Sequence, residues 1–178
     1  MRCFLKETSH FLKCKYPKAI LNAELLICKN IIAYIHSMPQ TNIALYWPLD
    51  HEVNIKPLIF TIHHIHQVLL PFVTERNMPL EFRTFSKKNF MTDAMGFLLP
   101  VDSGHIIPDI IFMPIIGVAL DGTRLGSGGG YYDRTCIMHP TIKTIGVGFS
   151  FQMCKKFDTD IHDQKLFAYI SELGIHTF

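Results

Sequence analysis

The sequence predicts a single α/β domain in a Rossmann-like three-layer arrangement, with a mostly parallel sheet and helices on both of its faces. Three observations indicate this fold. Short apolar segments of strand length alternate with segments of helical periodicity, which is the pattern of βαβ units. The segments interpreted as strands are apolar throughout, as strands covered on both faces are. The length of 178 residues suits one domain, 1–178, and no repeat or linker interrupts it.

The first half of the chain contains two predicted helices and two predicted buried strands. Residues 19–36 are expected to form a long amphipathic helix. Its predicted apolar stripe consists of Leu21, Leu25, Cys28, Ile32 and Ile35. A strand at Asn42–Trp47 precedes a second helix, on which Ile55, Leu58, Ile59 and Ile62 recur at helical spacing. Gln67–Val73 is then the second buried strand.

The second half of the chain alternates in the same way. Residues 86–108 show no sustained periodicity, so we expect them to be mostly loop. A short helix should begin near Tyr131 and end before Pro140, because the residue before a proline disfavours helix. The remaining strands are predicted at Leu80–Phe85, which alternates as a half-exposed strand does, and as buried strands at Asp109–Met113, Lys143–Phe149 and Ala168–Ile170.

Composition excludes several classes of protein. The formal net charge of +2 is too small to indicate nucleic acid or an anionic membrane as the main partner. The five cysteines are odd in number and never form Cys-x-x-Cys, which argues against a disulfide framework and a structural zinc site. The longest uncharged apolar stretch, Ile110–Leu120, is 11 residues, whereas a membrane span needs roughly 20. We expect a soluble, cytoplasmic protein that binds neither nucleic acid nor membrane.

A glycine-rich segment carries the clearest chemical signal. Gly126, Gly128, Gly129 and Gly130 are interrupted only by Ser127. Glycines let a backbone approach a ligand closely, and the N–H groups of such a loop before a helix can bind phosphate oxygens. Arg124 could add a bidentate contact to the same anion. Asp133 could hold a magnesium ion that bridges the phosphates.

This segment matches neither of the common nucleotide-binding fingerprints. A P-loop ends in Gly-Lys-Ser/Thr, and a dinucleotide fold requires Gly-x-Gly-x-x-Gly, but here Tyr131 follows Gly130 and stands three residues after Gly128. On glycine content alone, a structural strand-to-helix turn explains the segment as well as a phosphate site does. The charged residues Arg124 and Asp133 shift the balance toward phosphate and metal.

The segment closely resembles the signature of the 5-formyltetrahydrofolate cyclo-ligases, also called methenyltetrahydrofolate synthetases. The resemblance runs from Pro114 through Arg124-Leu-Gly-x-Gly-Gly-Gly-Tyr-Tyr-Asp-Arg134. Further segments similar to this family occur in the family's order across nearly the whole chain. They are Ala44–Val53, Met95–Pro100, Ile145–Gln152 and His162-Asp163.

The resemblance implies an ATP-dependent ring closure. In this family the γ-phosphate of ATP is transferred to the formyl oxygen of 5-formyltetrahydrofolate, N10 attacks the activated carbon, and phosphate leaves to give 5,10-methenyltetrahydrofolate. An amide-like oxygen is a poor leaving group until it is phosphorylated. Catalysis would then depend on positioning and charge neutralisation rather than on a protein nucleophile.

The resemblance also implies roles for individual residues. Arg124 and Tyr132 are the expected catalytic residues, and Asp133 and Asp163 the expected Mg²⁺ ligands. ATP contacts are expected from Arg2, Lys6, Arg124, Leu125, Gly126, Ser127, Gly128, Gly129, Gly130, Tyr131 and Tyr132. Contacts with the folate are expected from Trp47, Glu52, Ser127, Gly128, Gly129, Gly130 and Tyr131. The family's N-terminal basic pair, Lys-x-x-x-Arg, has its nearest match in Arg2-x-x-x-Lys6, in reversed order. We expect a monomer or a weak homodimer.

Departures from the family pattern keep two alternatives open. Ala119, Leu99 and Phe167 stand where the family usually has an acidic residue, so a module that binds nucleotide or folate without turnover is the second hypothesis. A sugar-phosphate isomerase or CoA-transferase of similar architecture is the third, on fold analogy alone. His63-His64-x-His66 invites a metal-site interpretation, but we interpret it as the polar end of a helix.

Overall fold

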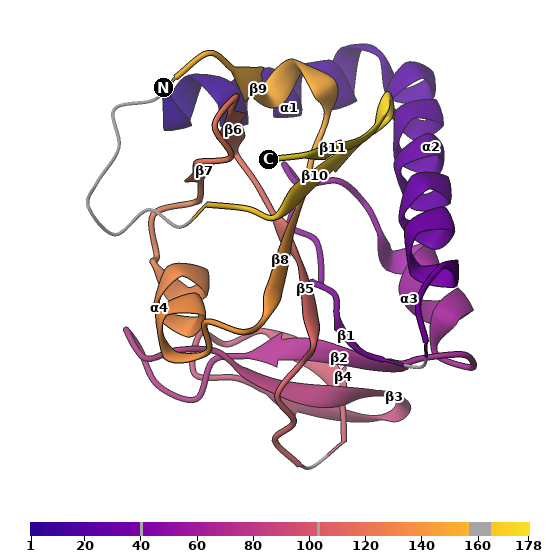
Figure 1. Ribbon diagram of the computed structural model, residues 1–178, viewed down its shortest axis with the longest axis vertical. Helices are drawn as coiled ribbons and strands as arrows, with labels where there is room; N and C mark the ends of the chain where they lie inside the picture. The colour runs from indigo at the N-terminus through magenta and orange to yellow at the C-terminus, as the bar shows by residue number, and fades with distance from the viewer. Residues whose placement is uncertain (40, 103, 157–164) are drawn as a thin grey trace.

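The elements of the protein follow the predicted alternation of strands and helices (Figure 1). The computed structural model describes residues 1–178 except 40, 103 and 157–164. Its helices are α1 (Arg2–Lys15), α2 (Pro17–His36), α3 (Lys56–Ile62), α4 (Tyr131–Met138) and the 3₁₀ turn η1 (Ser150–Gln152). Its strands are β1 (Asn42–Ala44), β2 (Gln67–Phe72), β3 (Glu81–Thr92), β4 (Leu98–Val101), β5 (Ile110–Pro114), β6 (Gly117–Ala119), β7 (Arg124–Leu125), β8 (Lys143–Val147), β9 (Met153–Cys154), β10 (Ala168–Ser171) and β11 (Gly174–Thr177).

One large sheet organises the chain. Its strand order is β11-β10-β8-β5-β1-β2-β3-β4. The five strands from β10 to β2 pair in parallel, and Ile43 in β1 lies opposite Val68 in β2 and Ile110 in β5. Antiparallel pairs complete both edges, with β11 on one side and the β3–β4 hairpin on the other. The prediction of a mostly parallel sheet is therefore confirmed.

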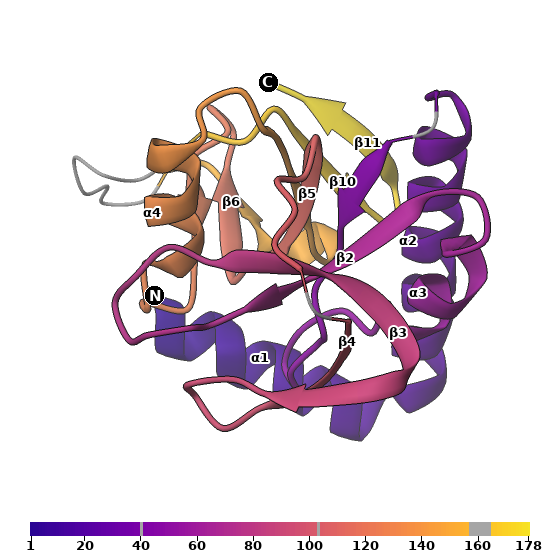
Figure 2. The ribbon, with the colours of Figure 1, turned by 90° about the horizontal axis from the view of Figure 1, so that it is seen from below.

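Each face of the sheet carries its own core, as the three-layer prediction requires. Along β1 and β5, alternate residues point to opposite faces because strand side chains have a period of two. Ile43 and Phe112 belong to the core under α2 and α3, whereas Ala44 and Met113 belong to the core on the side of α4. Figures 1 and 2 show α4 across the sheet from α2 and α3.

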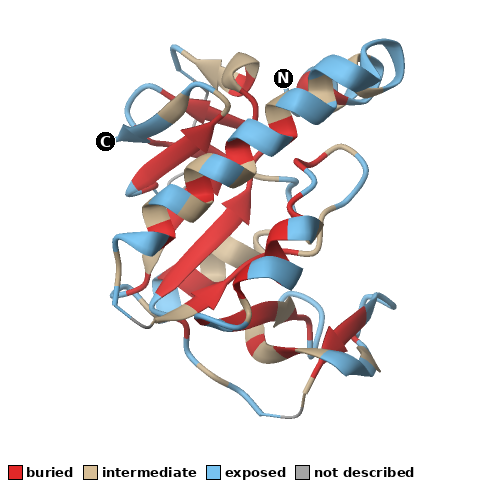
Figure 3. Ribbon diagram, turned by 90° about the vertical axis from the view of Figure 1, so that its right-hand side faces the viewer, coloured by how far each residue is buried: buried red, intermediate tan, exposed pale blue. Residues whose placement is uncertain are grey.

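The helix at 19–36 was predicted correctly, but its inner face was not. Leu21 and Leu25 are 54% and 57% exposed, and only Ile35 of the predicted stripe is buried. The inner face is made of Glu24, Ile27, Ile31 and Ile35. Both stripes have helical spacing, and α2 has apolar residues on most sides, so periodicity alone did not decide between them. Figure 3 shows the exposed outer side of α2 in pale blue.

Among the described helices, α2 also has the length and hydropathy of a membrane span, with a mean hydropathy of 1.3 over 18 residues. One such helix is weak evidence, because core helices of globular proteins meet the same criterion. Here Ile27, Ile31 and Ile35 are fully buried against the sheet.

The prediction that residues 86–108 are mostly loop was wrong. Strand β3 continues to Thr92 and pairs with β4. The register shifts between Phe85 and Phe90, and residues 87–90 are exposed. A bulge and a solvent-facing end remove the apolar alternation by which a strand is detected in a sequence.

A smaller unit covers the carboxyl ends of the large sheet. Strands β7, β6 and β9 form a three-stranded sheet in that order. Helix α1 packs on it through Leu5, which shares a small core with Ile116, Ala119 and Leu125. This unit brings the N-terminus of the chain close to the segment that follows β7.

Candidate functional site

The strand order places a cavity at the carboxyl edge of the sheet. Strand β1 has β2 on one side and β5 on the other. The chain continues from β1 toward β2 at one edge of the sheet, whereas after β5 it continues toward β8 and the other edge. In open α/β sheets the crevice at such a reversal is the usual place for a ligand. A cavity of about 330 Å³ lies there. The residues that line it are Tyr46, Trp47, Leu49, Glu52, Pro71, Val73, Leu80, Asp93, Met95, Phe97, Leu99, Pro114, Arg124, Gly126, Ser127, Gly128, Gly129, Gly130, Tyr131, Tyr132 and Asp133.

The cavity has two chemically different walls. The glycine loop, residues 126–130, and Arg124 form a polar wall. Most lining residues at the end of β2 and in the β3–β4 hairpin are apolar, among them Val73, Phe97 and Leu99. An anion and a flat apolar ring could therefore be bound side by side in one space.

The glycine loop presents free donors to this cavity. It leads from β7 into α4, and Gly130 is the N-cap of α4 with φ +65°. Gly128 also has a left-handed φ of +99°, a conformation that side chains disfavour. In the part of the chain that the structure describes, no backbone N–H of residues 126–130 donates to another protein group. Such unpaired N–H groups before a helix favour binding of an oxyanion.

Arg124 is buried beneath this loop, with 6% of its surface exposed. Its Nε and Nη2 groups donate to the Pro114 carbonyl oxygen at 3.3 and 3.1 Å. Its Nη1 lies 3.4 Å from Asp133 Oδ1, and the guanidinium stands 5.2 Å from the centre of the Tyr132 ring. A Cβ on Gly126 would lie 2.6 Å from Arg124 Nη1, so glycine at this position makes room for the guanidinium.

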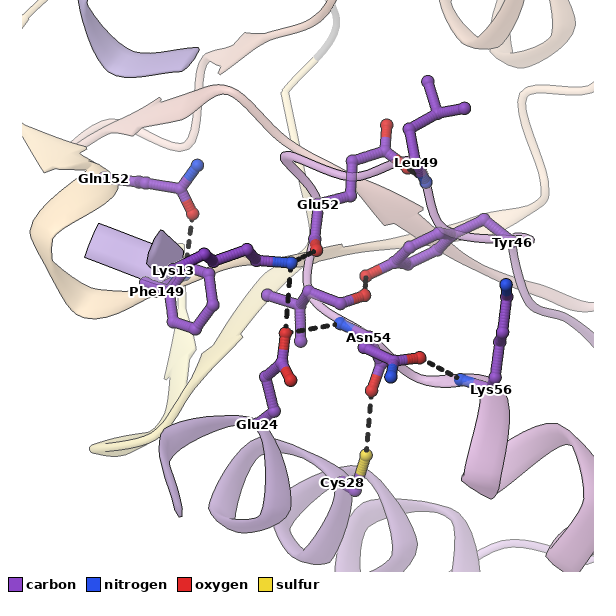
Figure 4. A network of polar contacts seen from close by, with 11 residues as sticks. Lys13, Glu24, Cys28, Tyr46, Leu49, Glu52, Asn54, Lys56, Phe149 and Gln152 are labelled. Atoms are coloured by element: carbon purple, nitrogen blue, oxygen red, sulfur yellow. Dashed lines mark hydrogen bonds and ion pairs between the residues drawn. The ribbon is translucent and has the colours of Figure 1, made fainter. Parts of the chain in front are cut away.

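Glu52 supplies a buried carboxylate to the lining of the same cavity, and Figure 4 shows it beside Leu49. It is 6% exposed, and its Oε2 accepts a hydrogen bond from the Leu49 N–H at 2.9 Å. Burial raises the pKa of Glu52, and the Leu49 hydrogen bond and the Arg124 charge oppose that rise. Trp47 lies in the same wall, with Lys56 Nζ 4.8 Å from its ring centre.

The structure brings most of the predicted site residues together, but three do not line the cavity. Leu125 is 6% exposed and packs in the small core with Leu5. Arg2 Nη1 lies 4.0 Å from the place a Gly128 Cβ would take, so α1 does carry a basic group to the glycine loop. Lys6 lines a neighbouring cavity of about 340 Å³ with Glu7, His10, Asp50 and His51.

The predicted magnesium ligands are only partly visible. Asp163 lies outside the described residues, and Asp133, half-buried, pairs with Arg124. The described residues contain no group of three or more His, Cys, Asp or Glu side chains that could hold a metal, the histidines at 63–66 included. Mg²⁺ is commonly held by one or two carboxylates together with substrate phosphates, so Asp133 beside the glycine loop fits such a shared site.

Asp93 is a cavity residue that the sequence prediction missed. It is 8% exposed, and its Oδ1 accepts hydrogen bonds from the N–H groups of Met95 and Phe97, both at 2.9 Å. These bonds shape the turn that carries Met95 into the cavity wall, where the Tyr131 hydroxyl donates to Met95 Sδ at 3.4 Å. An Asp followed by Gly three residues later is a turn signal, which residues 93–96 contain.

Fold and site together define the class of the molecule. It is a doubly wound α/β protein in which a glycine loop with free N–H groups faces an apolar cavity at the strand-order reversal. The chain belongs to the 5-formyltetrahydrofolate cyclo-ligase family, whose sequence model matches residues 10–172. The family resemblance inferred from the sequence is thereby confirmed.

Named relatives and solved structures agree with this assignment. The chain is 27% identical over 157 residues to the 5-formyltetrahydrofolate cyclo-ligase of Haemophilus influenzae, covering 82% of this chain and 83% of that protein. Its match with the mouse enzyme is 41% identical over 63 residues and spans 33% of this chain and 31% of the mouse protein. The fold is similar to the 5,10-methenyltetrahydrofolate synthetase of Aquifex aeolicus, with a TM-score of 0.77, 23% identity and coverage of 99% and 92% of the two chains. The corresponding Mycoplasma pneumoniae structure has a TM-score of 0.71, 22% identity and coverage of 96% and 98%.

Proposed function

We propose that this protein converts 5-formyltetrahydrofolate to 5,10-methenyltetrahydrofolate with ATP, releasing ADP and phosphate. Membership of the cyclo-ligase family supports the proposal. One observation of the structure carries it: a glycine loop whose N–H groups have no acceptor among the described residues and a buried carboxylate, Glu52, border the same cavity. The reaction needs this combination, because the γ-phosphate of ATP must reach an oxygen of a bound pterin.

The glycine loop and Arg124 would hold the reacting phosphates. Free N–H groups and a buried guanidinium stabilise the charge that spreads over the transferred phosphoryl group. Tyr132, whose ring lies beside Arg124, would help to place the formyl oxygen. Arg2 and Lys6 on α1 would bring further positive charge to ATP. Asp133, with Asp163, would hold Mg²⁺, which when bound neutralises phosphate charge.

The apolar wall and Glu52 would hold the folate. A pterin presents adjacent N–H donors, and an ionised carboxylate can accept from two of them. Glu52 already uses Oε2 for the Leu49 N–H, so its remaining lone pairs would face the pterin. Trp47 would pack against the ring, and residues 127–131 would contact the formyl end next to ATP.

The remaining expectations complete the proposal. We infer a single domain over 1–178 that works in the cytoplasm as a monomer or weak homodimer. Its partners would be ATP and 5-formyltetrahydrofolate, without nucleic acid or membrane. The small net charge of +2 supports the part of this inference that concerns nucleic acid and membrane.

One observation favours a second candidate, a module that binds its ligands without turnover. Leu99 lines the cavity and is 6% exposed, at a position where the resemblance led us to expect a glutamate. The other two departures lie apart from the cavity: Ala119 is buried in the small core, and Phe167 is 46% exposed. Membership of the cyclo-ligase family argues against the sugar-phosphate isomerase and the CoA-transferase as alternatives.

Incubation of the protein with ATP, Mg²⁺ and 5-formyltetrahydrofolate, followed by methenyl absorbance, tests the proposal. We expect ATP-dependent formation of product. Equilibrium binding of ATP and folate without any turnover would instead establish the second candidate.

A further inference from the structure

A charged pair joins the two N-terminal helices next to the main chain of Glu52 (Figure 4). Lys13 of α1 and Glu24 of α2 lie 3.2 Å apart, Nζ to Oε1, and their side chains are 21% and 11% exposed. Neither residue lines the cavity.

Both members of the pair also bind the main chain of the Glu52 segment. Lys13 Nζ donates to the Glu52 carbonyl oxygen, and Glu24 Oε1 accepts from the Asn54 N–H at 3.0 Å. Between them, the Tyr46 hydroxyl donates to the Val53 carbonyl oxygen at 3.0 Å. Three consecutive residues are therefore held by side chains from α1, from α2 and from the segment that follows β1, as Figure 4 shows.

A buried ion pair is an inefficient way to stabilise a fold. Its desolvation offsets much of the attraction between the charges, and apolar side chains of similar volume often do as well. What apolar side chains cannot supply at this place is a donor for the Glu52 carbonyl and an acceptor for the Asn54 N–H. The geometry thus indicates a role in fixing the backbone rather than only in joining two helices.

We propose that Lys13 and Glu24 are positioning residues for folate binding, which hold the main chain of residues 52–54 so that the Glu52 carboxylate meets the pterin. This inference rests on the proposed function, because it takes the pterin to be the partner of Glu52. It goes beyond that function by assigning two residues outside the cavity to the affinity for one substrate only. Most of the ATP side is held apart from this pair, through Arg124 and Pro114, and Arg2 and Lys6 lie in the amino-terminal half of α1, whereas Lys13 lies in its last turn.

The pair should also influence the protonation of Glu52. The positive charges of Arg124, Lys13 and Lys6 all favour its ionised form, whereas its burial opposes ionisation. Loss of Lys13 removes one of the three favourable charges. The pH below which folate binding weakens should then move upward.

The test compares Lys13→Met with the control Lys15→Met, which removes an exposed lysine from the same helix and leaves the Glu52 segment untouched. Trp47, the only tryptophan, lines the cavity, so its fluorescence reports folate binding without turnover. We expect Lys13→Met to weaken 5-formyltetrahydrofolate binding about tenfold or more, since displacement of a positioned group by about 1 Å can have effects up to a hundredfold. Binding of ATP, and both affinities of Lys15→Met, should stay within about twofold of wild type.

A double-mutant cycle with Glu52→Gln separates positioning from a general loss of structure. If Lys13 acts through the Glu52 carboxylate, Lys13→Met should add less than about twofold in the Glu52→Gln background. If Lys13→Met does not fold, Glu24→Gln, which keeps the shape of the side chain and removes the charge that holds Lys13, takes its place in the same cycle.

Three outcomes are distinguishable. A folate-specific loss that disappears in the Glu52→Gln background supports the inference. Unchanged folate binding by Lys13→Met, or an equal loss in both backgrounds, overturns it while wild-type turnover still upholds the proposed function. A wild-type protein that binds no folate and forms no methenyl product refutes the function, and the inference with it.

Discussion

Arg124 and Asp133, the two charged residues that flank the glycine loop, are paired with each other, Nη1 to Oδ1 at 3.4 Å. The sequence suggested separate roles for them, phosphate for the arginine and magnesium for the aspartate. In the structure each is the partner of the other beneath the loop, and Arg124 also binds the Pro114 carbonyl. ATP and Mg²⁺ would therefore meet a charge pair that is already in place.

Replacing Arg124 should impair the use of ATP. We expect Arg124→Met to lower kcat/KM for ATP by about 10- to 100-fold, because a charge-assisted hydrogen bond contributes about 1.5–3 kcal/mol. Steady-state kinetics on variants with a native circular dichroism spectrum would measure this. Arg76→Met, which removes an exposed arginine, is the matched control. Normal ATP kinetics in a folded Arg124→Met protein would remove this residue from the phosphate site.

Asp133→Asn should raise the Mg²⁺ concentration needed for half-maximal activity while the fold stays intact. Asp133 lies at the start of α4, and asparagine keeps its shape and an acceptor for Arg124 Nη1, so the fold should persist although the buried Arg124 loses the opposite charge. A magnesium titration of activity checks the prediction against Asp121→Asn, an exposed carboxylate. An unchanged titration would mean that Asp133 serves Arg124 alone.

Replacement by alanine should have different effects on stability and ATP affinity at Gly129 and at Gly130. Gly130 has φ +65°, so Gly130→Ala should destabilise the protein by about 1–2 kcal/mol. Gly129 is outside the left-handed region, but its added methyl would lie 2.9 Å from the Tyr131 ring, so that ring must shift. We expect Gly129→Ala to lose less stability than Gly130→Ala does, but to lose ATP affinity. Both quantities should be measured on one preparation; a destabilised Gly129→Ala that binds ATP normally would contradict the phosphate-site interpretation.

Folate binding should weaken on acidification at a higher pH than an ordinary glutamate would cause. Burial raises the pKa of Glu52 above the ordinary value of about 4.3, and only the ionised carboxylate can accept pterin N–H groups. As the pH falls through this raised pKa, the KM for folate should rise. Glu52→Gln should flatten that dependence without changing the KM for ATP. A folate KM with the same pH profile in both proteins would exclude Glu52 as the pterin partner.

The raised pKa of Glu52 has a second consequence, for stability. Between the ordinary pKa and the raised one, the folded protein binds the proton more tightly than the unfolded chain does. The contribution of Glu52 to stability therefore falls as the pH rises through this interval. Glu52→Gln should remove that fall, which unfolding in urea at several pH values between about 4 and 8 would detect.

Local signals in the sequence were sufficient for the buried strands and for the glycine loop. Strands β1, β2, β5, β8 and β10 are mostly apolar segments between turns. Because successive side chains of a strand point to opposite faces of the sheet, neighbouring residues belong to different cores. The inner face of α2 could not be found in this way, because a charged residue, Glu24, lies on it and is satisfied only by Lys13 and Asn54. A polar residue that is buried because a residue elsewhere in the chain pairs with it cannot be recognised from hydrophobic periodicity.

The same distinction applies to the site. The glycine loop is contiguous in the sequence, so residue types and spacing were sufficient to predict that it binds phosphate. Glu52 and Trp47 could be placed only through the resemblance to a family, since each alone is an unremarkable polar or aromatic residue. Asp93 was found neither from residue types nor from the resemblance. The hairpin that carries it was interpreted as loop, and its contacts with the N–H groups of Met95 and Phe97 cannot be inferred from the sequence.

Because strand order reverses between β1 and β5, the cavity lies at the carboxyl ends of these strands. Changes to the chain should therefore be tolerated better at the amino ends of the strands than at the carboxyl ends. The cavity residues of β1 and β5 lie at or just after the carboxyl ends of these strands, among them Tyr46 and Pro114, whereas the connections before β2 and β8, at 63–66 and 139–142, enter at the amino ends. Chain variation there leaves the reacting end untouched. A label or surface tether attached at His64 or Pro140, both exposed, would hold the molecule by its inert end and leave the cavity open to substrate.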